Sequence, residues 1–326
     1  MPGRRSLWRR LRRATRGPRN ALLARTIAGI ARVFAALPVP VALSTGRALG
    51  ATAHALLGRD RRLAREHVRM AFPALDEASR RALVRATFRH AGQSFAELAL
   101  WPRLGRRPDY VRFEQREVMD AALAEGRGVI AVAAHVGNWE LLAAAVAVHY
   151  PLSVVARRVN DERFNALIVG FRLGSQMEVL AREDPGFLSA VRDALRRNRI
   201  VALLIDQDTR GAGVFVPFFG RLARTPPGAA LLALRNRVPV ITAFIERRPD
   251  GGHLIRFTRV VLDGEADGRH RITALTARFT AAIEAQIRRA PAEWVWWHER
   301  WKRQPNGGES PLLPQEPVVG GRSSKD

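Results

Sequence analysis

The sequence contains no cysteine among its 326 residues. This absence excludes disulfide bonds, thiolate metal sites and a cysteine acyl-enzyme, and it gives no indication of an oxidising compartment. The G-x-S-x-G nucleophile elbow is missing as well, so a serine nucleophile also lacks its usual motif.

Acidic residues are scarce beside basic ones: 30 Asp and Glu stand against 54 Lys and Arg, which leaves a formal net charge of +24. Such an excess indicates an anionic partner, which can be a nucleic acid, an acidic membrane surface or an anionic substrate. The charge is spread along the whole chain and no nucleic-acid-binding motif accompanies it. A basic nucleic-acid-binding protein is therefore the remote alternative.

Long hydrophobic runs are also missing. Residues 21–57 are apolar but interrupted by arginine and proline, and the longest uncharged stretch, 33–46, is too short to cross about 30 Å of hydrocarbon as a helix. We expect two amphipathic helices that lie in the membrane interface and are joined at Pro38 and Pro40. A tilted span and soluble helices are the alternatives. The basic leader, 1–20, is expected to be disordered or to act as an electrostatic membrane anchor.

The rest of the chain predicts an α/β domain over 58–303, with a helical lead-in over 58–105 and an α/β core over 106–303. Short apolar runs alternate there with amphipathic segments, which is typical of a mostly parallel sheet flanked by helices. We expect strands at 128–134, 152–156, 178–181, 200–205, 238–245 and 253–261, the last two as a hairpin, and helices at 59–72, 79–100, 119–124, 141–148, 161–175, 186–197, 228–236 and 271–289. The tail, 304–326, is rich in Pro, Gly and Ser and is expected to be disordered.

One short motif, HVGNWE at 135–140, follows the most apolar predicted strand. His135 is expected at the carboxyl end of that strand, where open α/β sheets bind ligands. Glu140 is expected in the first turn of the next helix and can fold back onto the imidazole, where a carboxylate fixes the tautomer. The alternative is a histidine whose ring is satisfied by a backbone carbonyl.

Further blocks accompany this motif: REHVRMAFP at 65–73, RRVN at 157–160, DQD…GVFVPFFG…T at 206–225 and PAEWVWWHERWK at 291–302. In this order and spacing the chain resembles the bacterial lipid A biosynthesis acyltransferases of the lysophospholipid acyltransferase superfamily, over roughly 20–303. The chain departs from the family pattern at Arg158, where the family usually has proline, and at His67, where it usually has asparagine.

The resemblance implies an inner-membrane enzyme, peripheral or singly anchored, with its active site facing the cytoplasm. It implies transfer of a fatty acyl chain from acyl carrier protein to a hydroxyl of an anionic glycolipid, a lipid A precursor. The catalytic pair of the family corresponds to His135 and Glu140, with His135 as general base and direct transfer. Another glycolipid or a lysophospholipid is the alternative acceptor. No cofactor or metal is implied, because the thioester is already activated.

Other residues receive weaker assignments. Arg157 corresponds to the family's headgroup-binding arginine, with Arg158 and Arg172 as further candidates for the same phosphate. Gly137 and Asn138 can face the thioester oxyanion or simply form the turn. Phe215, Phe218 and Phe219 are expected to wall the acyl pocket or pack beneath it. Asp206 and Asp208 are compatible with a metal, but we favour a supporting role for both. The tryptophans of 294–301 are expected in the core rather than in an interfacial belt.

Overall fold

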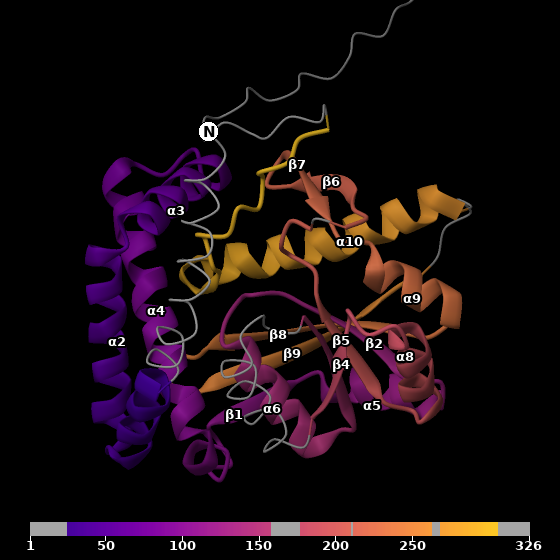
Figure 1. Cartoon of the computed structure of the whole chain (residues 1–326), viewed down its shortest axis with the longest axis horizontal. Coiled ribbons are helices and arrows are strands. Elements are labelled where there is room, and N and C mark those ends of the chain that lie inside the picture. The colour runs from indigo at the N-terminus through magenta and orange to yellow at the C-terminus, as the bar shows by residue number, and fades with distance from the viewer. Residues whose placement is uncertain (1–24, 158–176, 210, 263–267, 306–326) are drawn as a thin grey trace, which may run out of the picture.

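A seven-stranded sheet forms the centre of the computed structural model, which describes residues 25–157, 177–209, 211–262 and 268–305 (Figure 1). The strand order is β1-β9-β8-β2-β5-β3-β4. All neighbours are parallel except β8 and β9, which form the predicted hairpin. The strands are β1 (Val111–Glu114), β2 (Val129–Ala133), β3 (Leu152–Ala156), β4 (Glu178–Ala181), β5 (Ile200–Leu204), β8 (Val240–Arg247) and β9 (His253–Val260). The predicted α/β fold is confirmed.

Helices cover both faces of this sheet. On one face α5 (Arg116–Ala124) and α6 (Trp139–His149) pack against Val129, Ala131 and Ala133 of β2. On the other face Ile130 and Val132 of the same strand face α8 (Phe187–Arg196), α9 (Gly228–Asn236) and α10 (Gly268–Arg289). Every residue of β2 is buried, which explains why this strand is a continuous apolar run without alternation.

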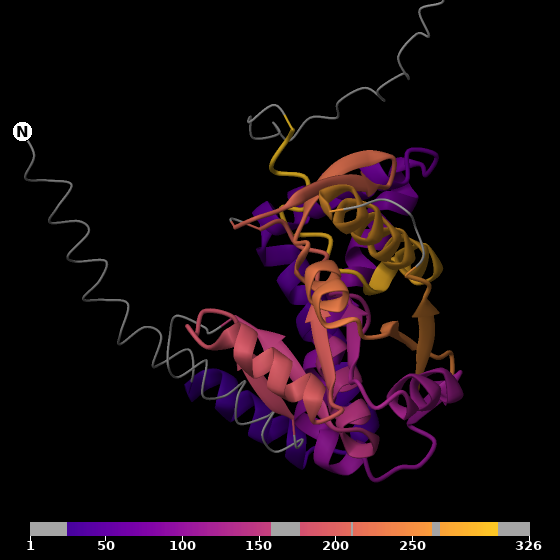
Figure 2. The same cartoon turned by 90° about the vertical axis from the view of Figure 1, so that its right-hand side faces the viewer.

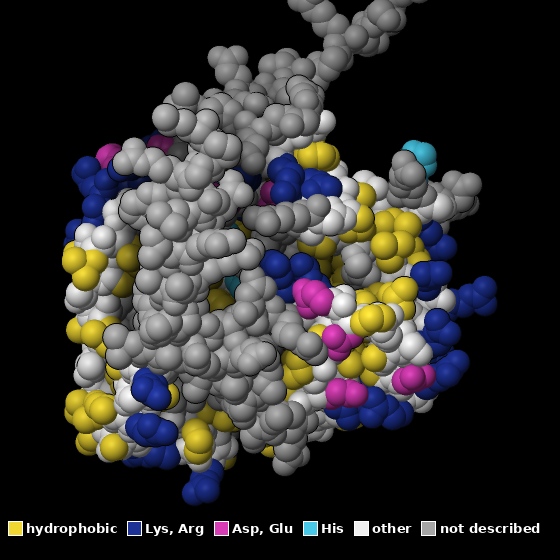
Figure 3. Space-filling model, viewed as in Figure 1, with side chains coloured by type: hydrophobic (Ala, Val, Ile, Leu, Met, Phe, Trp, Pro, Cys, Tyr) yellow, Lys and Arg dark blue, Asp and Glu magenta, His cyan; other side chains and the backbone are white. Residues whose placement is uncertain are grey.

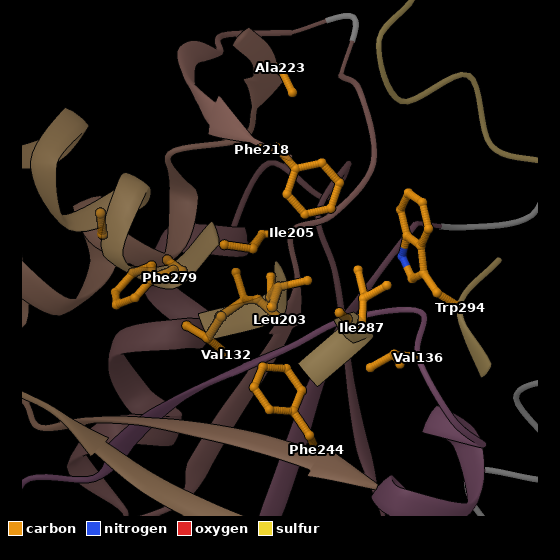
Figure 4. Packing of buried hydrophobic residues seen from close by; sticks show 14 of the residues in the cluster. Val132, Val136, Leu203, Ile205, Phe218, Ala223, Phe244, Phe279, Ile287 and Trp294 are labelled. Carbon is orange, nitrogen blue, oxygen red and sulfur yellow. The ribbon is translucent and has the colours of Figure 1, made fainter. Parts of the chain in front are cut away.

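A separate hairpin, β6 (Val214–Phe218) and β7 (Arg221–Thr225), lies above the sheet beside α10, as two perpendicular views show (Figures 1 and 2). Its turn residues Phe219 and Gly220 both have positive φ angles, 52° and 71°. A two-residue turn of this kind normally has asparagine or glycine at both positions. Because phenylalanine takes the first position, the sequence did not predict this hairpin, and neither β6 nor β7 was expected. Figure 4 shows Phe218 of this hairpin above Ile205 and Leu203.

The helical lead-in comprises residues 25–36, α2 (Val39–Leu56), α3 (Gly58–Ala71) and α4 (Glu77–Leu104). Asp76 caps α4 by accepting a hydrogen bond from the N–H of Ser79 at 2.7 Å. Two expectations were wrong here. α4 was expected to end at residue 100 but continues to Leu104 and includes Pro102 in its last turn, and the edge strand β1 lies ahead of 128–134, the first strand that was expected. Within the described ranges, no helix combines the length and apolarity needed to cross a bilayer.

Glycines let α2 approach α4 closely. A Cβ atom on Gly50 would lie 2.2 Å from the carbonyl oxygen of Phe88, and one on Gly92 would lie 2.2 Å from that of Gly46. Side chains at these positions would hold the helices apart. The contact therefore depends on small residues at corresponding turns of both helices.

We predict that Gly50→Ala destabilises the protein although alanine has the higher helix propensity. The added methyl group meets the fixed backbone of α4, and overpacking of this kind costs about 1–3 kcal/mol, more than the gain of about 1 kcal/mol in propensity. Urea unfolding should show a lower midpoint. Gly58→Ala is the matched control, because only the flexible end of Arg61, 3.9 Å away, lies near the added atom; an equal effect in both variants would contradict the prediction.

Candidate active site

The register between β2 and β5 determines which side chains meet at the site. These parallel neighbours place Ala133 opposite Leu204. His135 and Asp206 each follow two residues later, so both reach the same point at the carboxyl edge of the sheet. Arg157 follows directly after β3, the next strand beyond β5, and reaches the same edge.

His135 and Asp206 form a buried pair. Nδ1 of His135 lies 2.8 Å from Oδ1 of Asp206. Oδ2 accepts hydrogen bonds from the backbone N–H of His135 at 2.9 Å and from the indole N–H of Trp294 at 2.8 Å. The Asp206 side chain is 0% exposed and that of His135 18%. Burial alone would raise the pKa of Asp206, but the charge and hydrogen bond of His135, with the Trp294 hydrogen bond, hold this pKa well below its usual range.

The carboxylate on Nδ1 is therefore Asp206, and the expectation that Glu140 takes this position is corrected. Glu140 lies in the first turn of α6 and lines the same cleft as His135. Asp206 was expected to have only a supporting role, because the order of the strands in the sheet does not follow from their order in the chain. The signal that points to it is the equal two-residue offset of His135 and Asp206 from the ends of two strands.

Gln207 and His298, which were not among the predicted site residues, lie at the other side of the His135 ring. The amide nitrogen of Gln207 is 3.1 Å from Nε2 of His135 and 2.9 Å from Nε2 of His298. An amide nitrogen carries two N–H donors, so it can serve both rings when Nε2 is unprotonated in each. This network assigns the proton of His135 to Nδ1. Burial, followed by the charge of His135, lowers the pKa of His298 to about 4.

Gly137 and Asn138 support the turn between β2 and α6. Gly137 has a φ of 65°, and its N–H donates to the carbonyl of Glu293 at 3.0 Å. A Cβ atom there would lie 2.1 Å from the carbonyl oxygen of Ile245, so this position requires glycine. The Asn138 side chain caps α6 by accepting from the N–H of Leu141 at 3.2 Å. Of the two roles expected for Gly137 and Asn138, facing the oxyanion or forming the turn, these contacts correspond to the second.

A second buried network holds the same turn from the side of α4. Both oxygens of Glu97 face the guanidinium of Arg247, with Nη2 2.9 Å from Oε2. Glu97 also accepts from Asn138 at 3.0 Å and Tyr110 at 2.8 Å, and lies 2.9 Å from Nε2 of His253. Burial opposes ionisation of Glu97, but His253 and then Arg247 keep its pKa well below the usual range. The turn between β2 and α6 is therefore held in place by buried, charged side chains.

The cleft in front of His135 is rimmed by cations. Arg157, Arg182 and Arg235 line it together with Trp139 and Glu140. Arg157 is largely exposed, and its Nε lies 3.6 Å from a carboxylate oxygen of Glu183. The other two arginines predicted for the headgroup, Arg158 and Arg172, lie outside the described residues.

A narrow apolar cavity lies behind the cleft, between α6 and the sheet. Alanines contribute to its walls from both layers, and Trp139, Glu140, Val155, Leu203 and Leu204 line both spaces. The cavity therefore adjoins the cleft. The predicted acyl-pocket residues line neither: Phe218 and Phe219 are buried in the core beneath the hairpin, and Phe215 lies on β6. Phe218 and Phe219 were expected either to wall the acyl pocket or to pack beneath it, and the structure shows the second arrangement.

The C-terminal segment completes the site. Trp294, Trp296 and Trp301 are buried, and Trp294 forms a β-bridge with Val136 directly after His135 (Figure 4 shows both residues). The tryptophans therefore dock this segment as core residues, as predicted. Asp208 is engaged separately, in an ion pair with Arg303 at 3.1 Å.

Comparison with known proteins shows the family of the chain. The family model for the bacterial lipid A biosynthesis acyltransferases matches residues 12–303. The chain belongs to this family and is therefore an O-acyltransferase.

Its relatives carry different acyl and acceptor names. The chain is 25% identical over 287 residues to the lipid A biosynthesis palmitoleoyltransferase of Escherichia coli K12, covering 86% of this chain and 92% of the relative. It is 27% identical over 288 residues to the lauroyltransferase of the same organism, covering 86% and 91%. To the phosphatidylinositol mannoside acyltransferase of Mycobacterium tuberculosis H37Rv it is 32% identical over 190 residues, covering 56% and 57%.

We predict that the protein loses stability on mild acidification. Burial lowers the pKa of His67 and His298 to about 4 and that of His90 to about 3. Between those values and 6.5 the unfolded chain binds more protons than the folded one, so stability falls as pH falls. Burial raises the pKa of Glu293 to about 7, which acts in the opposite direction but concerns one group against three. The free energy of unfolding should drop by on the order of 3 kcal/mol between pH 7 and pH 5.

Urea unfolding across this range measures the effect. His298→Gln removes one of these titrations and should flatten the profile, whereas the exposed His270 provides the control, because His270→Gln should leave the profile unchanged. A stability that stays constant or rises on acidification would overturn the prediction.

Proposed function

We propose that the protein transfers a fatty acyl chain from the thioester of acyl carrier protein to a hydroxyl of a lipid A precursor. The observation that carries this proposal is the His135–Asp206 pair at the edge of a cleft that adjoins an apolar cavity. The reaction requires no cofactor, since a thioester is already activated toward attack by a hydroxyl.

His135 acts as general base. The acceptor hydroxyl takes the place of the Gln207 amide at Nε2, and its proton moves to this nitrogen while its oxygen forms a bond to the thioester carbon. The tetrahedral intermediate collapses by breaking the carbon–sulfur bond. The departing thiolate takes the proton back, which leaves an ester and the free thiol of the carrier. A positioned base of this kind contributes about 10²–10⁴-fold.

Asp206 orients the ring and stabilises the imidazolium, because its carboxylate holds the Nδ1 proton within a buried site. Glu140 remains a candidate catalytic residue. Its position in the first turn of α6, where it lines both the cleft and the cavity, suits a role toward the reacting groups rather than on the imidazole. No cysteine is available for a covalent intermediate, which favours direct transfer.

The two spaces suit two different parts of the substrates. The cavity behind α6 is apolar and suits the acyl chain, while the arginines at the rim of the cleft suit an anionic headgroup. Exposed Val41, Leu49 and Leu56 on α2 suit association with the inner membrane, peripheral or singly anchored, with the active site toward the cytoplasm. The net charge of +24 suits an anionic surface there.

A second acceptor class has an observation in its favour. The relative with the higher identity, 32%, is named for phosphatidylinositol mannoside, so another glycolipid or a lysophospholipid is the alternative acceptor. Purified protein incubated with acyl carrier protein thioesters and each acceptor in turn separates these cases. Acylation of the lipid A precursor is the expected result, and transfer only to the mannoside or to a lysophospholipid would replace the proposed acceptor.

Double-mutant kinetics test the mechanism. His135→Ala should lower kcat by at least about 10²-fold, or about 2.7 kcal/mol in the barrier. Asp206→Asn should add little to the His135→Ala loss, because residues that act as one unit are not additive, whereas Glu140→Gln should cause a separate loss. Asp208→Asn, whose carboxylate pairs with Arg303, is the control and should stay within about threefold of wild type. A folded His135→Ala protein with a tenth of wild-type kcat would refute the general base.

Arg157→Ala should raise the acceptor KM more than it changes kcat, because a headgroup contact far from the reacting atoms contributes uniform binding. Arg157→Lys should restore only part of the affinity, since an ammonium lacks the planar fork of a guanidinium. Arg196→Ala, exposed on α8 and paired only with Asp193 among the described residues, serves as the control. An unchanged acceptor KM would move the assignment to Arg158 or Arg172.

A further inference from the structure

A basic hollow lies between α2 and α4, outside the active site. Arg47 of α2 and Arg85 and Arg89 of α4 line it, together with Arg247 and Glu293. Arg85 and Arg89 are four residues apart on one helix, so their side chains project from the same face. Three exposed guanidinium groups from two helices thus converge on one depression.

These three arginines have no partner of opposite charge nearby among the described residues. Within the part of the chain that the structure describes, none of their side chains makes a hydrogen bond or an ion pair, whereas Arg247 beside them is paired with Glu97. Like charges at this spacing on a helix repel each other. The arrangement therefore lacks an anion that would relieve its repulsion.

The carboxylate at the hollow does not meet this need. Glu293 accepts hydrogen bonds from the backbone N–H of Arg247 at 3.1 and 3.3 Å, and burial raises its pKa to about 7. The backbone carbonyl of Glu293 accepts a hydrogen bond from the N–H of Gly137, in the turn that follows His135. The charge of the hollow is therefore positive.

The same helix pair also exposes apolar side chains. Leu49, Leu57 and Phe95 are exposed, and they form an apolar groove between α2 and α4 together with buried Phe88. Hydrophobic side chains are visible along the left-hand edge of Figure 3, where α2 lies in Figure 1. The helix pair thus presents a basic depression and a separate set of exposed apolar side chains, which match the two parts of a membrane lipid, a charged headgroup and an acyl region.

We propose that the α2–α4 hollow binds the phosphate of an anionic membrane phospholipid and thereby orients α2 on the bilayer surface. Arginine suits this role, because its planar guanidinium binds phosphate oxygens in a bidentate manner. The site rests on the proposed membrane association but is separate from acyl transfer, since Arg47, Arg85 and Arg89 line neither the cleft nor the cavity. A nucleic acid would use the cations but leave the apolar side chains unused.

Co-sedimentation with vesicles tests the site. The full chain is mixed at about 0.15 M salt, where surface charges are screened beyond about 8 Å, with phosphatidylcholine vesicles with and without phosphatidylglycerol. Arg47→Gln/Arg85→Gln/Arg89→Gln should bind the anionic vesicles at least about tenfold more weakly than wild type. The control Arg106→Gln/Arg107→Gln/Arg192→Gln removes the same charge at exposed arginines whose side chains have no bond or ion pair within the described ranges; it should stay within about threefold.

Each other outcome overturns part of the proposal. Equal losses in both triple variants would show that net charge alone drives binding. If wild type bound vesicles with and without phosphatidylglycerol equally well, the hollow would not recognise the charge of an anionic phospholipid. A wild-type chain that binds no vesicles would overturn the membrane association together with the site. Inorganic phosphate that raises the melting temperature of wild type but not of the first variant, without vesicle binding, would assign the hollow to a soluble phosphate. Transfer measured in detergent should be unchanged in both variants, so loss of the proposed activity is distinguished from loss of this site.

Discussion

The buried carboxylate of Asp206 is the constraint on which this site depends. An ionised carboxylate without solvent is tolerated only when its oxygens are hydrogen-bonded. Asp206 meets this requirement with three donors: two from His135 and one from Trp294. The last donor lies 88 residues away in the sequence, so the C-terminal segment must dock before the pair is complete. Assembly of the catalytic pair and folding of the chain end are thus one event.

A second buried carboxylate, that of Glu97, supports the other side of the turn between β2 and α6. Glu97 of α4 holds Arg247 at the end of β8 and Asn138 at the start of α6, so three elements meet at one buried charge. Removing one member of such a buried pair typically costs about 3–5 kcal/mol, because the remaining charge is left without a partner. The lead-in helices therefore support the active site directly, although they contribute no residue to the cleft.

Periodicity predicted most of the fold, because β2, β5 and the hairpin of β8 and β9 are apolar runs with clear ends. It did not predict β1, β6 or β7. β1 and β7 are four or five residues long and contain charged side chains, so they carry little pattern, and β6 contains Pro217, a residue that argues against a strand. At the site, HVGNWE indicated His135, but a local motif favours a local partner, and Glu140 was chosen over Asp206. Only the order of strands in the sheet places Asp206 beside the ring. Gln207 and His298 depend on the same long-range contacts, which spacing along the chain does not encode.

The position of His135 relates the two spaces to each other. Trp139 and Glu140 line both the cleft and the cavity, and the His135 ring lies 5.0 Å from that of Trp139, centroid to centroid. If the acyl chain occupies the apolar cavity and the headgroup the basic cleft, as proposed, the thioester and the hydroxyl must meet at this shared boundary. The cavity would then select the length of the acyl chain and the cleft would select the acceptor, on two sides of the same general base.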